Sequence, residues 1–280
     1  MSPPEPRNRQ RREDIQLYSR GLEDYFDDDS IMIEGDQSVE YYVDWPVVAA
    51  LQEWTVTAES QSLCIIGPYQ PEEQSTMSMI AVKYAASAIE AKLPVISYFC
   101  ELPRNGIPSD STPEAEALVS LAYSLVQQLI ELLPSVFESA AQLHSQRFEV
   151  LDGTLGSWDH VVGILKDLLD LSPPVLFCVI DGLKILEDQR TRQPLADFID
   201  ALHGHDGNRD DTQVSKRKLK SLFTTAGRSR CLLDYLTEEE LVFAEKPSTG
   251  RNPGKQASGR RALSPSGYLS RVDGSEPADE

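Results

Sequence analysis

Short apolar runs, separated by longer helical segments, constrain the fold of this chain more than any other feature. Three nearly continuous runs cover residues 63–66, 95–100 and 175–180, and two further strand-like segments cover residues 219–224 and 241–244. Strands that are apolar on both faces are typical of a parallel sheet covered by helices on both sides. Alternation of such strands with helices specifies right-handed crossovers. The sequence therefore predicts a three-layer α/β domain around a mainly parallel five-stranded sheet.

Between the runs, apolar residues recur at helical spacing. The strongest case is residues 113–133, where Leu118, Leu121, Leu125 and Leu129 lie three or four residues apart. This spacing indicates a helix with one buried face. Helices are predicted over residues 46–58, 77–91, 113–133, 135–148, 157–171, 194–203 and 229–236.

Apolar periodicity begins near Trp45 and stops after residue 244, which predicts one domain over residues 45–244. Residues 245–280 are dominated by Gly, Ser, Pro and Arg and are predicted to be a disordered tail. Residues 1–44 are predicted to be an acidic, largely disordered leader. Residues 21–60 contain eleven Asp and Glu residues and no Lys or Arg, with aromatic residues between the acids. Such a segment is either a solvated leader or a partner-binding arm.

The formal net charge of −19, from 26 basic and 45 acidic residues, argues against a general nucleic-acid binder. No apolar run is long enough to span a membrane, and the first residues do not resemble a secretory signal. The four cysteines are widely spaced, lack a CxxC pair and have no metal-binding spacing with His. Isolated thiols favour a reducing, cytoplasmic location over a disulfide framework.

Parallel sheets bind ligands at the carboxyl ends of their strands, so the residues that follow each strand are the candidate site residues. The first strand ends at Gly67, and Gln74, Ser75 and Thr76 stand immediately before a helix. Strand, glycine, hydroxyl residues and helix are placed as in a phosphate-binding loop, in which Lys contacts phosphate and a hydroxyl holds Mg²⁺.

That loop departs from the GxxxxGK[ST] pattern. Gln74 stands where Lys is required, the loop is one residue longer, and Pro68 and Pro71 remove two amide donors. Glu72 and Glu73 add negative charge where a triphosphate would lie, and like charges repel. The segment is therefore either a modified phosphate loop or an ordinary turn in which Ser75 or Thr76 caps the helix.

Two more strand ends have polar residues. Asp181 follows the third strand, within Asp-Gly-Leu, where an acid can hold Mg²⁺ or serve as a turn residue. Arg228 and Arg230 follow the fourth strand, where a guanidinium can contact a γ-phosphate or remain exposed beside a helix cap.

Taken together, these stretches resemble the NACHT-type and nephrocystin-like P-loop NTPase domains of the signal-transduction NTPase class, which occur in many fungal multidomain proteins. The resemblance spans roughly residues 46–244 and implies that the Gly67 strand lies beside the 219–224 strand. By this resemblance Gly67 to Thr76 corresponds to Walker A, Asp181 to Walker B, and the segment before Arg228 to sensor 1. Active members carry a Walker A Lys and a second acid after Asp-Gly-Leu, whereas this chain has Gln74 and Lys184. Both departures imply lost hydrolysis.

Three functions follow as hypotheses. The first is a catalytically degenerate regulatory or protein-interaction module that has protein partners and needs no cofactor. The second is a nucleotide switch or weak ATPase or GTPase, in which Gly67, Gln74, Ser75, Thr76, Arg228 and Arg230 contact Mg-ATP or Mg-GTP and Asp181 holds Mg²⁺. In that version Lys83 or Lys184 replaces the missing Lys. The third is a truncated remnant without an independent role.

Overall fold

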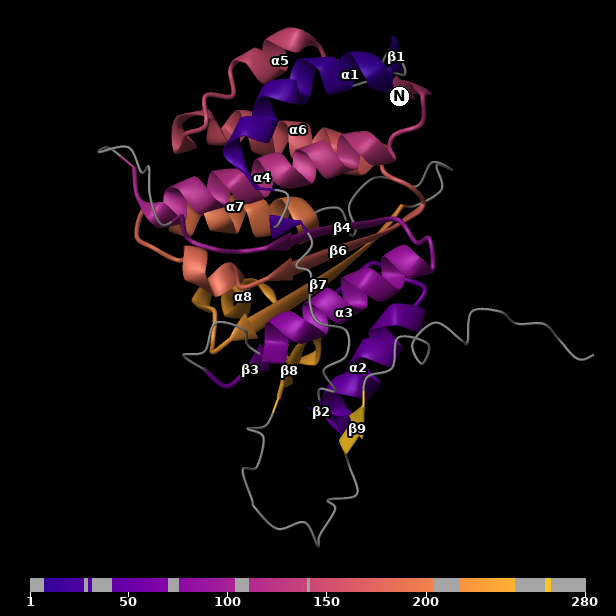
Figure 1. Ribbon diagram of the computed structural model, residues 1–280, viewed down its shortest axis with the longest axis vertical. Helices are drawn as coiled ribbons and strands as arrows, with labels where there is room; N and C mark the ends of the chain where they lie inside the picture. The colour runs from indigo at the N-terminus through magenta and orange to yellow at the C-terminus, as the bar shows by residue number, and fades with distance from the viewer. Residues whose placement is uncertain are drawn as a thin grey trace, which may run out of the picture.

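A five-stranded parallel sheet forms the centre of the molecule, in the order β4-β6-β7-β3-β8 (Figure 1). The computed structural model describes residues 8–27, 30–31, 42–69, 76–103, 111–139, 142–203, 217–244 and 260–262. The strands of the sheet are β3 (Gln61–Gly67), β4 (Val95–Phe99), β6 (Val175–Asp181), β7 (Lys218–Ala226) and β8 (Leu241–Phe243). The predicted three-layer α/β fold is confirmed, and β3 lies beside β7 as expected.

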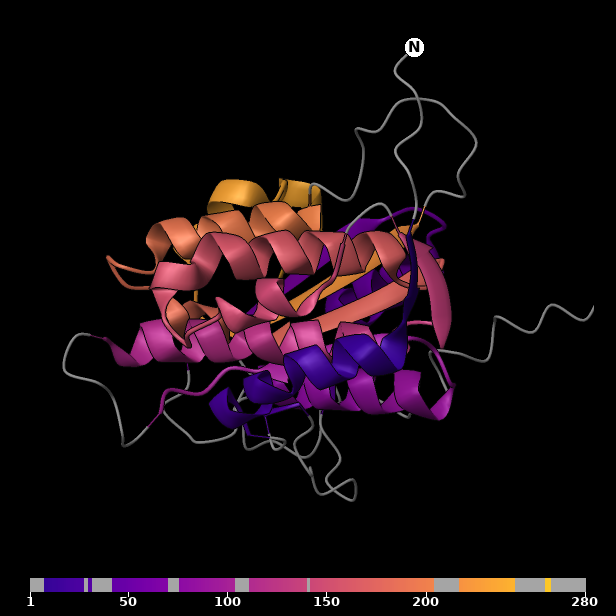
Figure 2. The ribbon, with the colours of Figure 1, turned by 90° about the horizontal axis from the view of Figure 1, so that it is seen from above.

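Helices cover both faces of this sheet, as apolar strands require. One face packs against α2 (Trp45–Val56) and α3 (Thr76–Glu90). The other packs against α4 (Pro113–Leu132), α6 (Trp158–Leu171) and α7 (Arg192–His203) (Figure 1). The short α8 (Arg230–Tyr235) contributes Cys231 and Leu232 to this second face. Figure 2 shows the same layers from above.

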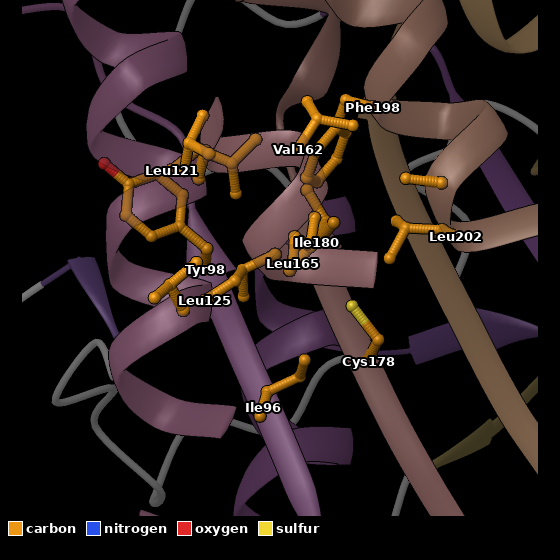
Figure 3. Close-up of a cluster of buried hydrophobic side chains, with 14 of the residues drawn as sticks. Ile96, Tyr98, Leu121, Leu125, Val162, Leu165, Cys178, Ile180, Phe198 and Leu202 are labelled. Carbon is orange, nitrogen blue, oxygen red and sulfur yellow. The ribbon is translucent and has the colours of Figure 1, made fainter. Parts of the chain in front are cut away.

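Successive strand residues point to opposite faces, so each strand contributes to two separate cores. On β6, Cys178 and Ile180 lie in the core under α4 and α6, while Phe177 and Val179 lie in the core under α2 and α3. Figure 3 shows the first of these cores, in which Cys178 and Ile180 lie among side chains from α4, α6 and α7. Both cores are closely packed, and their central side chains have almost no exposure to solvent.

The ends of α4 follow from its sequence. The Thr112 hydroxyl accepts a hydrogen bond from the Ala115 amide at 3.2 Å, and Pro113 occupies the first turn. Both features favour a helix start. Pro134 follows the end of the helix, because proline cannot continue it without losing a backbone bond.

Residues 8–27, which the sequence analysis assigned to the leader, form β1 (Asn8–Arg11), α1 (Arg12–Ser19) and the 3-10 helix η1 (Arg20–Tyr25). Ile15 and Leu22 are buried in the larger core, and α1 and η1 pack on α4. These contacts are long-range, so the weak local periodicity of the acidic segment does not indicate them. The remainder of residues 1–44 includes residues 42–44 of β2 and residues that lie outside the described ones.

The helix predicted over residues 135–148 is wrong. Residues 136–139 form β5 (Val136–Ser139), which pairs antiparallel with β1, and the short helix α5 (Ser145–Glu149) follows. Arg11 pairs with Val136 and Asn8 with Ser139. A partner far back in the sequence thus decides the conformation of this segment, and tertiary pairing overrides local propensity.

A second antiparallel pair joins β2 (Tyr42–Asp44) to β9 (Arg260–Ala262), with Asp44 opposite Arg260. These three residues belong to the predicted tail, whose other members after Ala244 lie outside the described residues. Short 3-10 helices complete the described elements: η3 (Leu155–Ser157), η4 (Leu183–Leu186) and η6 (Glu238–Glu240). Among the described residues, no helix combines the length and apolar character needed to cross a bilayer.

Candidate functional site

The carboxyl ends of β3 and β7 form the candidate site, because the chain leaves these neighbouring strands on opposite faces of the sheet. After β3 the next helix is α3, on one face, whereas after β7 it is α8, on the other. Such a switch point is where open α/β sheets bind ligands. The two strand ends are joined by a hydrogen bond from the Gly227 amide to the Gly67 carbonyl at 2.8 Å.

Gly67 allows β3 and α3 to approach closely. A Cβ built on Gly67 would lie 2.5 Å from Met77 Cγ, so a side chain here would displace Met77 from the core. Thr76 is the first residue of α3 and is half-buried. Gln74 and Ser75, together with Glu72 and Glu73, lie outside the described residues. The described part of the loop therefore assigns Gly67 a packing role.

The carboxyl group of Asp181 lies in the interior, at the end of β6. It accepts a hydrogen bond from the Thr224 hydroxyl of β7 at 2.5 Å, and only 7% of the residue is exposed. Burial raises the pKa of Asp181 above its usual value, although hydrogen bonds from Ser78 and Thr224 lower it in part. Desolvation disfavours the charged form of a carboxyl group.

A magnesium ion fits these described residues poorly. Mg²⁺ needs ionised, oxygen-rich ligands with room for several waters. Asp181 is buried, biased toward its protonated form and already hydrogen-bonded. In the described part of the chain no cluster of three or more His, Cys, Asp and Glu side chains could hold a metal ion.

Lys184 lies at the same strand ends, in the 3-10 helix η4 that follows β6. Its ammonium nitrogen is 5.5 Å from the centre of the Tyr69 ring, a cation–π contact between η4 and the end of β3. A Cβ built on Gly227 would lie 2.7 Å from this nitrogen, and Gly227 has a φ of +91°. Glycine at this position thus leaves the space that Lys184 occupies.

The two arginines of the sequence analysis have different surroundings. Arg228 is exposed, and its guanidinium carbon lies 5.7 Å from the centre of the Phe243 ring at the end of β8. Arg230 begins α8, and its backbone amide donates a hydrogen bond to Glu187 at 3.2 Å. The structure therefore brings Arg228 to the strand ends with Gly67 and Asp181, while the Arg230 side chain is exposed on α8.

Glu187 occupies the amino end of α8. Its carboxylate accepts hydrogen bonds from the Ser229 hydroxyl and from the amides of Arg230 and Cys231. A helix amino terminus attracts anions because its first amides have no partner within the helix. Here the chain supplies that anion itself, so these amides are not available to a phosphate.

From the sequence, Lys184 was predicted as a departure from the family pattern and as one of two substitutes for the missing Lys, whereas Tyr69 and Glu187 were not predicted as site residues. Tyr69 could have been found as an aromatic residue directly after a buried strand. Glu187 could have been found as an acid that follows the strand before a Ser-Arg helix start, but its partner Ser229 is 42 residues away. Only the folded sheet shows that the two meet.

A hollow of about 630 Å³ lies elsewhere, beside the edge strand β4. Its lining includes Glu23, Phe26, Glu131 and the amides of Gln127 and Gln128. Both amides are used within the fold: Gln127 bonds to Ser19, and Gln128 bonds to both backbone groups of Ser97. This hollow is therefore part of the junction between the amino-terminal elements and the sheet.

No family model, curated protein or solved structure matches this chain. The geometry of the strand ends is therefore the basis for a proposed function.

Proposed function

We propose that the chain is a catalytically degenerate, NACHT-like P-loop domain that acts as a regulatory or protein-interaction module. The observation that supports it most is the state of Asp181. A carboxyl group that orders Mg²⁺ must be ionised and accessible, whereas Asp181 is buried, hydrogen-bonded to Thr224 and shifted toward its protonated form. The position of β3 beside β7 agrees with the resemblance on which the proposal draws.

Two further contacts support lost hydrolysis. Lys184 stands where an acid would polarise the attacking water, and a cation cannot accept that proton. Glu187 caps α8, so the amides that follow the sensor-like strand end are already paired. The four cysteines are unpaired and buried, which supports a location in a reducing cytosol.

The second candidate is a nucleotide switch with a modified loop, and the position of Lys184 favours it. Lys184 reaches the strand ends beside Tyr69, whereas Lys83 lies about two turns into α3. Between the two lysines considered as substitutes for the missing Walker A Lys, Lys184 is therefore the better placed. The third candidate, a remnant without a role, is opposed by the two closely packed cores.

Calorimetry with Mg-ATP and Mg-GTP separates the first two candidates. We expect no binding at millimolar nucleotide and no thermal shift, although a ligand at 100 times its Kd would add about 2.7 kcal/mol to the free energy of unfolding. Nucleotide hydrolysis that is lost in Asp181→Asn, an isosteric change, and retained in the exposed control Glu149→Gln would refute the proposal.

A Gln74→Lys variant tests whether only the lysine is missing from the loop. We expect little gain in Mg-ATP affinity, because the extra residue, Pro68 and Pro71 all remain. If Gln74→Lys binds Mg-ATP at least tenfold more tightly than the wild type, the loop geometry is intact and the nucleotide switch becomes the better description.

A further inference from the structure

Two cation–aromatic pairs lie at the carboxyl ends of the strands of this strongly acidic protein, with both rings and Arg228 exposed and Lys184 half-buried. The first is Lys184 with Tyr69, and the second is Arg228 with Phe243. Tyr69 is 73% exposed and Phe243 is 52% exposed. The pairs meet through the β7 end, because Gly227 contacts Lys184 and Tyr69 and is followed directly by Arg228. We call these four residues the cation–aromatic edge.

The two cations are not paired with carboxylates in the described part of the chain. The ion pairs found there are Arg147 with Asp167 and Lys166 with Asp200, both distant in sequence from this edge. The two acids nearest in sequence to Lys184 have other partners: Asp181 accepts a hydrogen bond from Thr224, and Glu187 caps the amino end of α8. Within the described residues, the positive charge of Lys184 and Arg228 is thus not neutralised by an ion pair.

The aromatic rings complement that charge. Aromatic residues and arginine are enriched at protein interfaces, where a ring packs against apolar side chains and a cation can meet a carboxylate. The described residues do not provide an amide cradle for a phosphate here, because the α8 amides are capped. Each of the two side-chain cations can instead pair with one carboxylate of a peptide whose acidic residues are spaced apart.

We propose that the cation–aromatic edge is a docking surface for an acidic segment of a partner protein, one that bears aromatic or aliphatic residues between its carboxylates. This inference rests on the proposed function and names the chemistry of its partner. The charge of the chain makes the surface selective, because an acidic partner is repelled by the molecule as a whole and attracted only where cations are exposed.

The test uses a fluorescein-labelled copolymer of glutamate and tyrosine as the probe, measured by fluorescence anisotropy with the full chain. We expect saturable binding that weakens as salt rises, since exposed ionic contacts are screened. The double variant Lys184→Glu/Arg228→Glu should bind at least about tenfold more weakly, because it places like charges opposite the probe.

The matched control is Arg9→Glu/Arg20→Glu, which changes two exposed arginines of the amino-terminal elements and alters the net charge by the same amount. It should change the dissociation constant less than about twofold, since its charges lie elsewhere on the surface. A thermal melt of each variant shows whether Lys184→Glu disturbs folding. If it does, the double variant Lys184→Gln/Arg228→Gln, which removes both positive charges without adding negative ones, takes its place. A smaller loss in the same direction is then expected.

Two results would overturn the docking surface and leave the proposed function intact: no binding of the probe by the wild type, or equal weakening in the edge variant and its control. Displacement of the probe by millimolar Mg-ATP would instead identify the edge as a nucleotide site and would contradict both proposals. Sedimentation of the wild type and the edge variant gives the last outcome. If the wild type self-associates and the variant does not, the docking surface binds a second copy of this chain and not a different protein.

Discussion

At the scale of single residues, two acids near the end of β6 have opposite roles. Asp181 is withdrawn into the interior, where burial raises its pKa and Thr224 donates to it. Glu187 is half-buried and accepts hydrogen bonds from one hydroxyl and two amides at the start of α8. Both carboxylates already have hydrogen-bond partners within the fold, which is the residue-level basis for the proposed loss of hydrolysis.

The pH dependence of stability should reveal the state of Asp181. Its pKa in the folded chain lies above the ordinary value of 3.8, so the folded state holds the proton more tightly than the unfolded state does. The resulting stability is complete below that value and is lost as the pH rises through the raised pKa. Asp181→Asn removes this loss, so the free energy of unfolding of the variant should rise relative to that of the wild type as the pH increases above about 4.

Urea unfolding at a series of pH values measures that difference. The exposed variant Glu149→Gln serves as the control and should run parallel to the wild type. If the curve for Asp181→Asn also runs parallel to that of the wild type, the pKa of Asp181 is not raised by folding. Asp181 would then be ionised at neutral pH and could serve as a magnesium ligand.

Removal of the α8 cap is the second residue-level prediction. Glu187→Ala should lower the free energy of unfolding by about 1–2 kcal/mol, because three donors at the helix start lose a charged acceptor. Chemical denaturation provides the measurement, with Glu149→Ala as an exposed comparison. A change below about 0.5 kcal/mol, typical of surface substitutions, would show that water replaces the cap without cost.

At the scale of elements, long-range partners decide what local patterns cannot. The apolar runs predicted every strand of the central sheet, because a doubly buried strand has a distinctive composition. Residues 136–139 have helical neighbours and become β5 only because β1 pairs with them.

The edge strand β4 is also covered by a long-range contact. The side-chain amide of Gln128 forms hydrogen bonds with the backbone amide and the carbonyl of Ser97, each at 2.8 Å. An edge closed in this way is protected from pairing with other strands.

The docking of α1 on the domain leads to a prediction at this scale. Ile15 is 1% exposed, whereas Leu17, two residues further along the same helix, is 68% exposed. Ile15→Ala should lower the free energy of unfolding by about 2–4 kcal/mol through the cavity it leaves, and Leu17→Ala should change it by less than about 0.5 kcal/mol.

Urea unfolding of the two variants shows whether the amino-terminal elements belong to the cooperative unit. If both substitutions have the same small effect, α1 does not unfold with the sheet, and the domain begins near Trp45 as the sequence predicted.

At the scale of the whole molecule, the strand order was only partly predictable from the sequence. Composition indicated a parallel sheet, and the resemblance indicated that β3 lies beside β7, which the structure confirms. The candidate site was less predictable, because its contacts join residues that are far apart in the chain. Lys184 reaches Tyr69, and Glu187 reaches Ser229, only once three strands are aligned in register. The Gln74 and Ser75 assignments stay predictions, since both residues lie outside the described ones.

The strand order also determines how the protein can be made on the ribosome. β3 is the first strand of the central sheet to be synthesised, yet both of its neighbours, β7 and β8, lie between residues 218 and 243. A nascent chain shorter than this presents an interior strand of four consecutive buried apolar residues with both edges unpaired. Parallel pairings over such sequence separations form slowly and expose the chain to aggregation. We therefore expect β3 to be a site of aggregation during translation until the carboxyl-terminal strands emerge.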